Sequence, residues 1–404
     1  MERLIYRQIW EDLISQKSLI FLAGPRQCGK TTFARMVAST FSNSFYFNWD
    51  FVTHKKLLIE NPTFFEAINR KDASIPLVIL DEIHKYRKWK NYLKGIYDPF
   101  AESYRFLVLG SGRLNLFQKG GDSLAGRYFL FYLWPLTLAE LGQCRQSFNG
   151  FMKNPLAVSD TNPSLENIWE QLSHLSGFPE PYLSGKETVY RRWGRNYEKQ
   201  LIREDIRNMT QIKDIDSIEI LFSLLPSKVG SPLSMASLAR DLQVSFNSIR
   251  LWLSVFDAFF LTFQLSPWTK KISRAITKGK KLYLFDYARI PSPSVKFENM
   301  VALELLRAVS NWNDLGLGDF GLHYLRNKEG EEVDFLITNE EDPFLLIEAK
   351  LSEEEISKSL VRFQSLLNVP AIQVVNKTGI YKIISNGTNQ LLLITAPRWL
   401  ANLP

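Results

Sequence analysis

Gly24-Pro25-Arg26-Gln27-Cys28-Gly29-Lys30-Thr31 is the stretch that decides the fold of the first part of this 404-residue chain. It fits the pattern G-x-x-x-x-G-K-[ST], and it lies between an apolar run at 18–22 and a helical pattern that starts at Thr31. The glycines let backbone N–H groups turn inward around phosphate oxygens, and the helix N-terminus adds a partial positive charge. The motif therefore predicts a phosphate-binding loop.

Each residue type in this loop has an expected part in holding a nucleoside triphosphate and Mg²⁺. The Lys30 ammonium would neutralise the β- and γ-phosphates and act in catalysis, while the Thr31 hydroxyl would be a metal ligand. Cys28 is expected to be a free thiol, since the chain has only two cysteines. The predicted nucleotide-binding set is Gly24, Pro25, Arg26, Gln27, Cys28, Gly29, Lys30, Thr31 and Thr32.

Two carboxylates follow the apolar run 77–80. Asp81 matches an acid that completes the Mg²⁺ shell, and Glu82 matches a base that orients or activates water. Paired acids can also simply cap the following helix. Because they accompany the phosphate-binding loop, we favour the catalytic interpretation.

Two more residues are candidate catalytic groups. Ser111 follows the strand pattern 106–109 and is placed to sense the γ-phosphate or the attacking water, with a plain turn serine as the alternative. Arg127 follows a glycine-rich stretch, where it could neutralise transition-state charge in its own subunit or in a neighbour. A plain surface arginine is the alternative.

The order of apolar runs predicts an α/β protein of several domains. Five runs (18–22, 45–47, 77–80, 106–109 and 128–131) alternate with helical segments, which is typical of a parallel sheet buried on both faces. We expect a P-loop ATPase domain at 1–150, a helical lid at 163–230, a winged helix at 231–285 and an α/β domain at 286–404. Residues 143–163 have the composition of a linker.

Three segments resemble a widespread prokaryotic family of AAA-superfamily ATPases: Gly24–Thr32, Leu80–Lys85 and Gly121–Tyr128. The resemblance continues through Leu136–Leu141 and Gly177–Tyr182. It implies ATP rather than GTP, a lid after the ATPase core, a winged helix, and a C-terminal domain similar to restriction endonucleases of the PD-(D/E)xK type. At Gly110-Ser111-Gly112-Arg113 the chain departs from the Ser-Ser or Ser-Ala pair that is more usual in the family.

The middle module is strongly basic. Residues 231–285 carry eight basic and two acidic side chains, and six of the basic ones fall between Trp268 and Lys281: Lys270, Lys271, Arg274, Lys278, Lys280 and Lys281. Between two strands they predict a basic wing tip that contacts DNA, with Asn247, Ser248 and Arg250 on the second helix. Packing against another domain, or a merely solvated loop, is the alternative.

The last domain is acidic, with 16 acidic and 11 basic side chains in 286–404. Glu348 and Lys350 share a face of one strand, and a predicted hairpin at 338–343 brings Asp334 beside them. With Glu298 on the preceding helix, or Glu304 as a second possibility, this resembles the D…(D/E)-x-K core of the nucleases, which implies a second divalent metal. Surface pairing of Glu348 and Lys350 is the other interpretation.

Together these features predict Mg²⁺-dependent ATP binding and hydrolysis coupled to a DNA-associated activity, with metal-dependent cleavage by the last domain as one form of it. The alternatives are a nucleotide-dependent switch with an inactive nuclease-like domain, and an ATP-driven protein remodeller. No apolar run reaches the ~20 residues of a spanning helix, and we expect a cytoplasmic protein without membrane contact. AAA-type ATPases commonly form rings, which leaves a homo-oligomer open.

Overall fold

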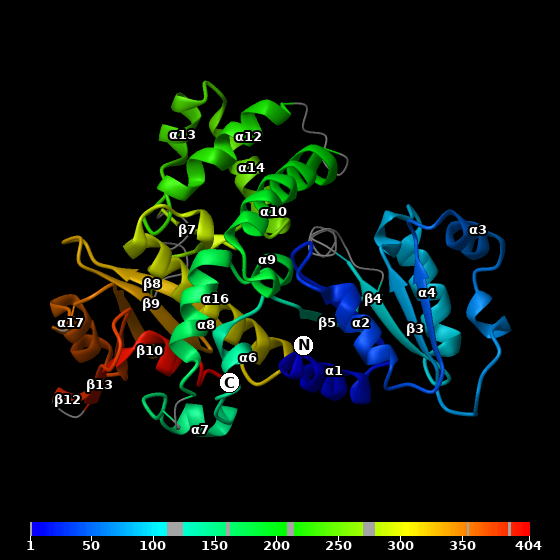
Figure 1. Cartoon of the computed structure of the whole chain (residues 1–404), viewed down its shortest axis with the longest axis horizontal. Coiled ribbons are helices and arrows are strands. Elements are labelled where there is room, and N and C mark those ends of the chain that lie inside the picture. Colours follow the sequence, from blue (N-terminus) through cyan, green and yellow to red (C-terminus); the bar gives the residue numbers. More distant parts are fainter. Residues whose placement is uncertain are drawn as a thin grey trace. The chain divides into compact units, whose positions relative to one another are not determined.

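The computed structural model describes residues 2–110, 124–158, 162–207, 214–269, 279–353, 355–386 and 389–404. The chain divides into two compact units. The first comprises residues 1–135 with 258–260, and the second comprises 136–257 with 261–404. Each unit has a β-sheet of its own (Figure 1).

The first unit is built on a five-stranded parallel sheet in the order β2-β3-β4-β1-β5. All five strands predicted from the apolar runs are present, so the α/β class and the parallel sheet of a P-loop NTPase fold are confirmed. The strands are β1 (Leu19–Ala23), β2 (Ser44–Asn48), β3 (Leu77–Asp81), β4 (Arg105–Leu109) and β5 (Phe129–Tyr132). The helices are α1 (Leu4–Gln16), α2 (Lys30–Ala38), α3 (Val52–Glu60) and α4 (Trp89–Phe100), with short 3₁₀ turns at Phe64–Ala67 and Ile83–Lys85.

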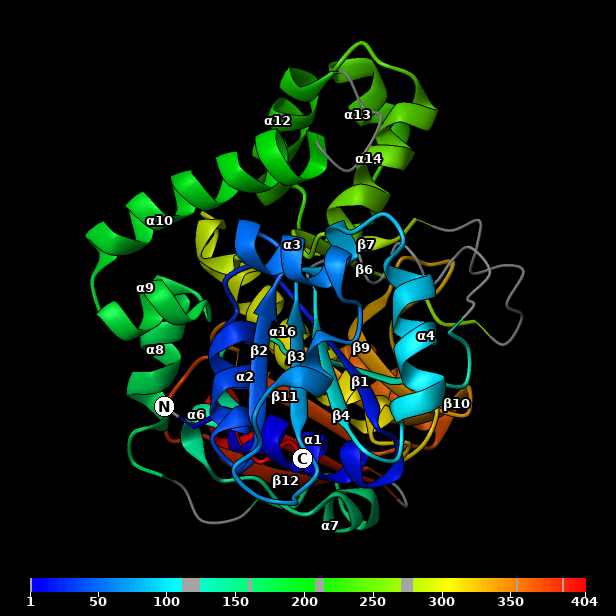
Figure 2. The same cartoon turned by 90° about the vertical axis from the view of Figure 1, so that its right-hand side faces the viewer.

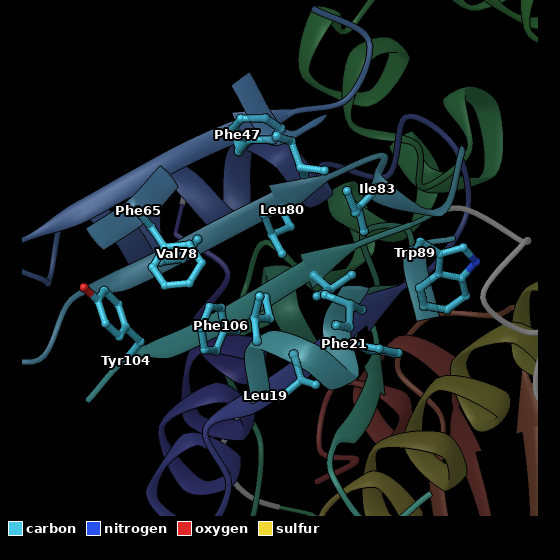
Figure 3. Packing of buried hydrophobic residues seen from close by; sticks show 14 of the residues in the cluster. Leu19, Phe21, Phe47, Phe65, Val78, Leu80, Ile83, Trp89, Tyr104 and Phe106 are labelled. Atoms are coloured by element: carbon cyan, nitrogen blue, oxygen red, sulfur yellow. The ribbon is translucent and has the colours of Figure 1, made fainter. Parts of the chain in front are cut away.

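Helices cover this sheet on both sides, which is why its strands are almost continuously apolar. Figure 2 shows α2 and α4 flanking the strands. On the α4 side, Trp89 packs near Phe21, with ring centroids 6.1 Å apart, and Figure 3 shows Val78 and Phe106 in the same buried cluster. This packing fixes the carboxyl ends of β1 and β3, where the candidate site lies.

The second unit begins with helices. They are α6 (Leu138–Gly142), α7 (Phe148–Lys153), α8 (Leu165–Leu175), α9 (Pro179–Ser184), α10 (Glu187–Lys199), a π-helical turn (Gln200–Ile206), α12 (Ile215–Leu224) and a 3₁₀ turn (Leu225–Ser227). The helical character expected for 163–230 is therefore present. The stretch 143–163, expected to be a linker, contains α7, because Phe148 and Phe151 pack on Trp312.

Two helices and a hairpin follow in the predicted order: α13 (Met235–Asp241), α14 (Phe246–Ala258), then antiparallel β6 (Thr262–Leu265) and β7 (Lys281–Leu284). Gln243, with φ of 54°, forms the turn between the helices. The apolar run from Phe259 to Leu265 favours a strand over its whole length, but β6 starts only at Thr262, because Phe260 takes φ of 57° and breaks the extended run.

The last part of the chain forms a six-stranded sheet in the order β12-β13-β11-β10-β9-β8. The elements are a 3₁₀ turn (Tyr287–Arg289), α16 (Pro293–Asp314), β8 (Phe320–Arg326), β9 (Glu332–Asn339), β10 (Asp342–Lys350), α17 (Lys358–Leu367), β11 (Ala371–Val375), β12 (Tyr381–Asn386), β13 (Asn389–Thr395) and α18 (Ala396–Leu400). The predicted hairpin is present: β9 and β10 pair from Asn339 and Asp342, and the turn residues Glu340 and Glu341 both have positive φ. It joins the strands that carry Asp334 and Glu348.

Candidate active site

The loop between β1 and α2 has the backbone that a phosphate cradle needs. Gly24, Gln27 and Gly29 have φ of 147°, 61° and 100°, all in the region that favours glycine. At Gly24 a Cβ atom would lie 2.2 Å from the carbonyl oxygen of Leu133, so this position excludes any larger residue. The loop leads directly into the N-terminus of α2, whose first N–H groups have no acceptor within the helix and are available to bind phosphate oxygens.

Lys30, the first residue of α2, directs its ammonium into the loop. Nζ donates to the carbonyl oxygens of Gly24, at 2.9 Å, and Pro25, at 2.6 Å. Arg3 fixes the loop from the other side, donating to the carbonyl oxygen of Cys28 at 3.0 Å. Both cysteines are free thiols, as expected, and Cys28 is buried. The loop thus holds a cation at the place where phosphate charge is expected.

Asp81, at the end of β3, meets Thr31 of the loop. The Thr31 hydroxyl donates to Asp81 Oδ2 at 2.9 Å, and the Tyr46 hydroxyl donates to the same oxygen at 2.6 Å. Burial raises the pKa of Asp81, and these two hydrogen bonds oppose the shift. Burial and the bond to Asp81 raise the pKa of Tyr46 to about 12. A hydroxyl and a carboxylate beside a phosphate loop are hard oxygen ligands, so these residues fit Mg²⁺.

Glu82 follows Asp81 in the left-handed region, with φ of 56°. A glutamate rarely adopts this conformation, and such strain clusters at functional sites. Its Oε2 lies 3.0 Å from Lys85 Nζ, which in turn lies 2.6 Å from Asp50 Oδ2. His84 Nε2 is 3.5 Å from the same Glu82 oxygen. The carboxylate expected to orient water is therefore held by its own neighbours.

Of the other two expected catalytic residues, Arg127 and Ser111, the structure describes only Arg127. Arg127 forms a two-pronged ion pair with Asp98 of α4, at 2.8 Å and 3.3 Å. It would have to leave this partner to reach a phosphate in either subunit. Ser111 lies outside the described residues.

The acidic centre of the second unit brings together Glu298, Asp334, Glu348 and Lys350. Glu348 accepts from Lys350 Nζ at 2.9 Å and from the Asp334 amide at 3.2 Å. Burial raises the pKa of Glu348, and it does the same for Glu298. Within the described ranges, no group of three or more His, Cys, Asp or Glu residues is arranged to hold a metal ion.

The predicted location of Lys281 is wrong. Expected at an exposed wing tip, it is only 1% exposed and inserts between Glu298, Glu332 and Asp334. Burial disfavours its charge, but these carboxylates outweigh burial and raise the pKa of Lys281. The sequence alone does not indicate that a lysine on a strand pairs with carboxylates that lie 17 to 53 residues away.

Helix α14, which is predicted to contact DNA, exposes two of the three side chains expected to make that contact. Asn247 and Arg250 of α14 are exposed, whereas Ser248 is half-buried and its hydroxyl lies 2.9 Å from that of Ser245. The aromatic residues around this helix are buried and contribute to packing: Trp252, Phe256, Phe259, Phe260 and Phe263. Lys270, Lys271, Arg274 and Lys278 lie outside the described residues.

Sequence reasoning also missed Tyr46, Lys85 and Asp50 as groups around the candidate metal-binding end of the sheet. The available signal was the polar ending of the run Tyr46-Phe47-Asn48-Trp49-Asp50, since β2 neighbours β3 and parallel strands end at one edge.

Comparison with family models assigns the first unit. Residues 16–142 match the model described as AAA domain. This part of the chain is thus similar to AAA domains. Residues 166–289 and 296–395 match two models described as domains of unknown function, DUF8612 and DUF4143. The winged-helix and endonuclease-like assignments therefore remain proposals.

Two curated relatives resemble the chain over most of its length. They are uncharacterized proteins of Mycobacterium tuberculosis and Mycobacterium bovis, each 23% identical over 363 residues, which is 85% of this chain and 72% of the relative. Solved structures resemble it more distantly. A Walker-type ATPase of Pyrococcus abyssi aligns with 72% of this chain and 95% of its own at 15% identity and a TM-score of 0.45. The ADP complex of Hsp104 from Saccharomyces cerevisiae aligns with 91% of this chain and 64% of its own, at 12% identity and a TM-score of 0.32.

None of the helices in the described residues is both long enough and apolar enough to span a bilayer.

Proposed function

We propose that the protein is a Mg²⁺-dependent ATPase whose nucleotide state controls an activity on DNA. The observation that carries the ATPase part is the meeting of Lys30, Thr31 and Asp81 at the end of the parallel sheet. An ammonium, a hydroxyl and a carboxylate lie together there beside a glycine-bounded loop. Positioning and charge stabilisation are what phosphoryl transfer requires of a protein.

Each residue has a defined task in this proposal. Lys30 exchanges the loop carbonyl oxygens for phosphate oxygens, and Thr31 and Asp81 hold Mg²⁺. The metal ion, when bound, neutralises developing charge on the transferred group. Glu82 orients the attacking water once it leaves Lys85, and Arg127 supplies positive charge once it leaves Asp98. Ser111 remains a candidate sensor.

Steady-state ATP turnover tests these tasks. Lys30→Ala is expected to abolish turnover, because it removes the ammonium that Lys30 directs into the loop. Glu82→Gln is expected to keep nucleotide binding and to lower turnover by about 100-fold or more, the usual contribution of a positioned base. The matched control is Lys94→Ala, an exposed lysine of α4. Turnover that survives Lys30→Ala unchanged would refute the site.

The DNA part rests on the helix–helix–hairpin order of α13, α14, β6 and β7 and on the basic composition of 231–285. We infer that this module is a winged helix and that Arg250 and Asn247 of α14 face the nucleic acid. Each lysine or arginine that meets a phosphate releases counterions, which makes affinity fall with salt.

Fluorescence anisotropy of duplex DNA at several salt concentrations tests this part. Arg250→Ala is expected to lower the slope of log affinity against log salt by about 0.9. Lys358→Ala, an exposed lysine of α17, is the control and should leave the slope unchanged. Wild-type protein that shows no salt-dependent affinity would favour a remodeller of proteins.

A second candidate function is a nucleotide-dependent switch whose last domain does not cut DNA. Its support is the ammonium of Lys281 among Glu298, Glu332 and Asp334, a place where a nuclease would hold metal. Incubation of plasmid or branched DNA with Mg²⁺ or Mn²⁺ separates the two. Cutting that disappears in Asp334→Ala supports a nuclease, whereas intact DNA under all conditions supports the switch.

A further inference from the structure

Lys281 is the first residue of β7, and its ammonium group pairs with three carboxylates of the acidic centre. Nζ lies 2.6 Å from Glu332 Oε1, 3.2 Å from Glu298 Oε1 and 3.3 Å from Asp334 Oδ1. An ammonium carries three N–H donors. Here three carboxylates take one each, so the group is fully hydrogen-bonded although its side chain is 1% exposed.

Asp334 and Glu348, two of the three carboxylates expected to bind metal, have a protein donor on both oxygens, and the third, Glu298, accepts from Lys281 and Tyr283 through Oε1. Asp334 Oδ1 accepts from Lys281 and Oδ2 from the Ala349 amide, at 3.1 Å. Glu348 Oε1 accepts from Lys350 Nζ and Oε2 from the Asp334 amide. A divalent ion needs several such oxygens at about 2.0–2.6 Å. The residues present therefore do not fit a bound metal while Lys281 stays in place.

The surrounding chain holds this arrangement. The Tyr283 hydroxyl donates to Glu298 Oε1 at 2.8 Å, on the same oxygen that meets Lys281. Gly230, with φ of 76°, packs its backbone against Glu298, where a Cβ would come within 3.0 Å of Oε2. The Gly230 amide donates to Leu282 of β7 at 3.2 Å. Removing either partner of a buried ion pair leaves a costly unpaired charge, so the ammonium stays with its carboxylates.

We propose that Lys281 is a built-in counter-ion that takes the place of a divalent cation at this centre and closes it to metal. The hairpin β6–β7 supplies the cation, α16 and β9 supply the carboxylates, and the ion-pair cluster joins these elements. This inference concerns the second unit alone and does not depend on nucleotide binding by the first.

The substitution Lys281→Met tests it by gain of binding. Methionine keeps a similar length but removes the charge, which leaves the carboxylates of Glu298, Glu332 and Asp334 without their counter-ion. Mn²⁺ alone, without nucleotide, is titrated into the full chain, and free Mn²⁺ is counted by electron paramagnetic resonance. We expect Lys281→Met to gain one site that binds Mn²⁺ at least about tenfold more tightly than wild type, because a unit charge about 3 Å away has gone.

Two further variants decide what the gained site is. Lys281→Arg keeps the charge and should bind Mn²⁺ as wild type does. Lys281→Met with Asp334→Asn should lose the gained site. A folded Lys281→Met variant without any gain would overturn the proposal.

Wild-type protein gives a readout that does not depend on the variant folding. Equal Mn²⁺ binding by wild type and Asp334→Asn supports a centre already closed by Lys281. Binding by wild type that is lost in Asp334→Asn would overturn it. Circular dichroism shows whether each variant is folded.

Discussion

Removing the Tyr46 hydroxyl should weaken binding of the metal–nucleotide complex and leave binding of the nucleotide alone intact. Tyr46 lies on β2, and its hydroxyl donates at 2.6 Å to the Asp81 oxygen that Thr31 also meets. A hydrogen bond to a charged group contributes about 1.5–3 kcal/mol. Tyr46→Phe should therefore cost about 1–2 kcal/mol of Mg²⁺–ATP binding, or about 5–30-fold in Kd, since water replaces part of the lost bond.

The assay is titration of a fluorescent ATP analogue, once with Mg²⁺ and once with EDTA. With EDTA the change should stay below about twofold, because Tyr46 acts through Asp81, the proposed metal ligand, and not on the phosphates. Tyr104→Phe is the matched control, since Tyr104 lies in the aromatic cluster with Phe65 and Phe106. An equal loss with and without Mg²⁺ would refute the reasoning, and so would no loss with Mg²⁺.

Two more predictions concern stability, and both are read from thermal or denaturant unfolding. Gly24→Ala should destabilise the first unit by about 2 kcal/mol or more, because its Cβ would clash with the Leu133 carbonyl oxygen in a strained backbone region. Gly95→Ala, in open space on α4, should instead stabilise by about 0.5–1 kcal/mol. Burial raises the pKa of Glu304 from 4.5 to about 7, so the fold favours its protonated form and wild type loses stability as pH rises from 4.5 to about 7. Glu304→Gln should reduce that loss by about 3 kcal/mol, and an unchanged difference between pH 4.5 and pH 8 would contradict it.

Local patterns predicted the fold of the first unit well because its determinants are local. Apolar runs identify strands of a buried parallel sheet, and a loop of eight residues carries its own backbone requirements. The pairing of Glu348 with Lys350 and the hairpin that brings up Asp334 likewise follow from strand periodicity and a short turn. These features depend on residues within about twenty positions of one another.

Contacts between distant segments were beyond such reasoning. A basic run between strands predicts solvent exposure, yet Lys281 is buried because carboxylates of α16 and β9 surround it. Tyr46 read as an ordinary strand aromatic, since only the order of β2 next to β3 places its hydroxyl on Asp81. The partner of Arg127 could not be predicted either, because Asp98 lies 29 residues earlier on a separate helix.

Isothermal titration of Mg²⁺–ATP into the folded full chain tests the central claim most directly. The phosphate-binding loop should give saturable binding at one site per chain. That heat should vanish in Lys30→Ala and persist in the control Lys94→Ala. A folded wild-type protein that gives no heat at two temperatures, or a Lys30→Ala variant that binds as tightly as wild type, would contradict the account.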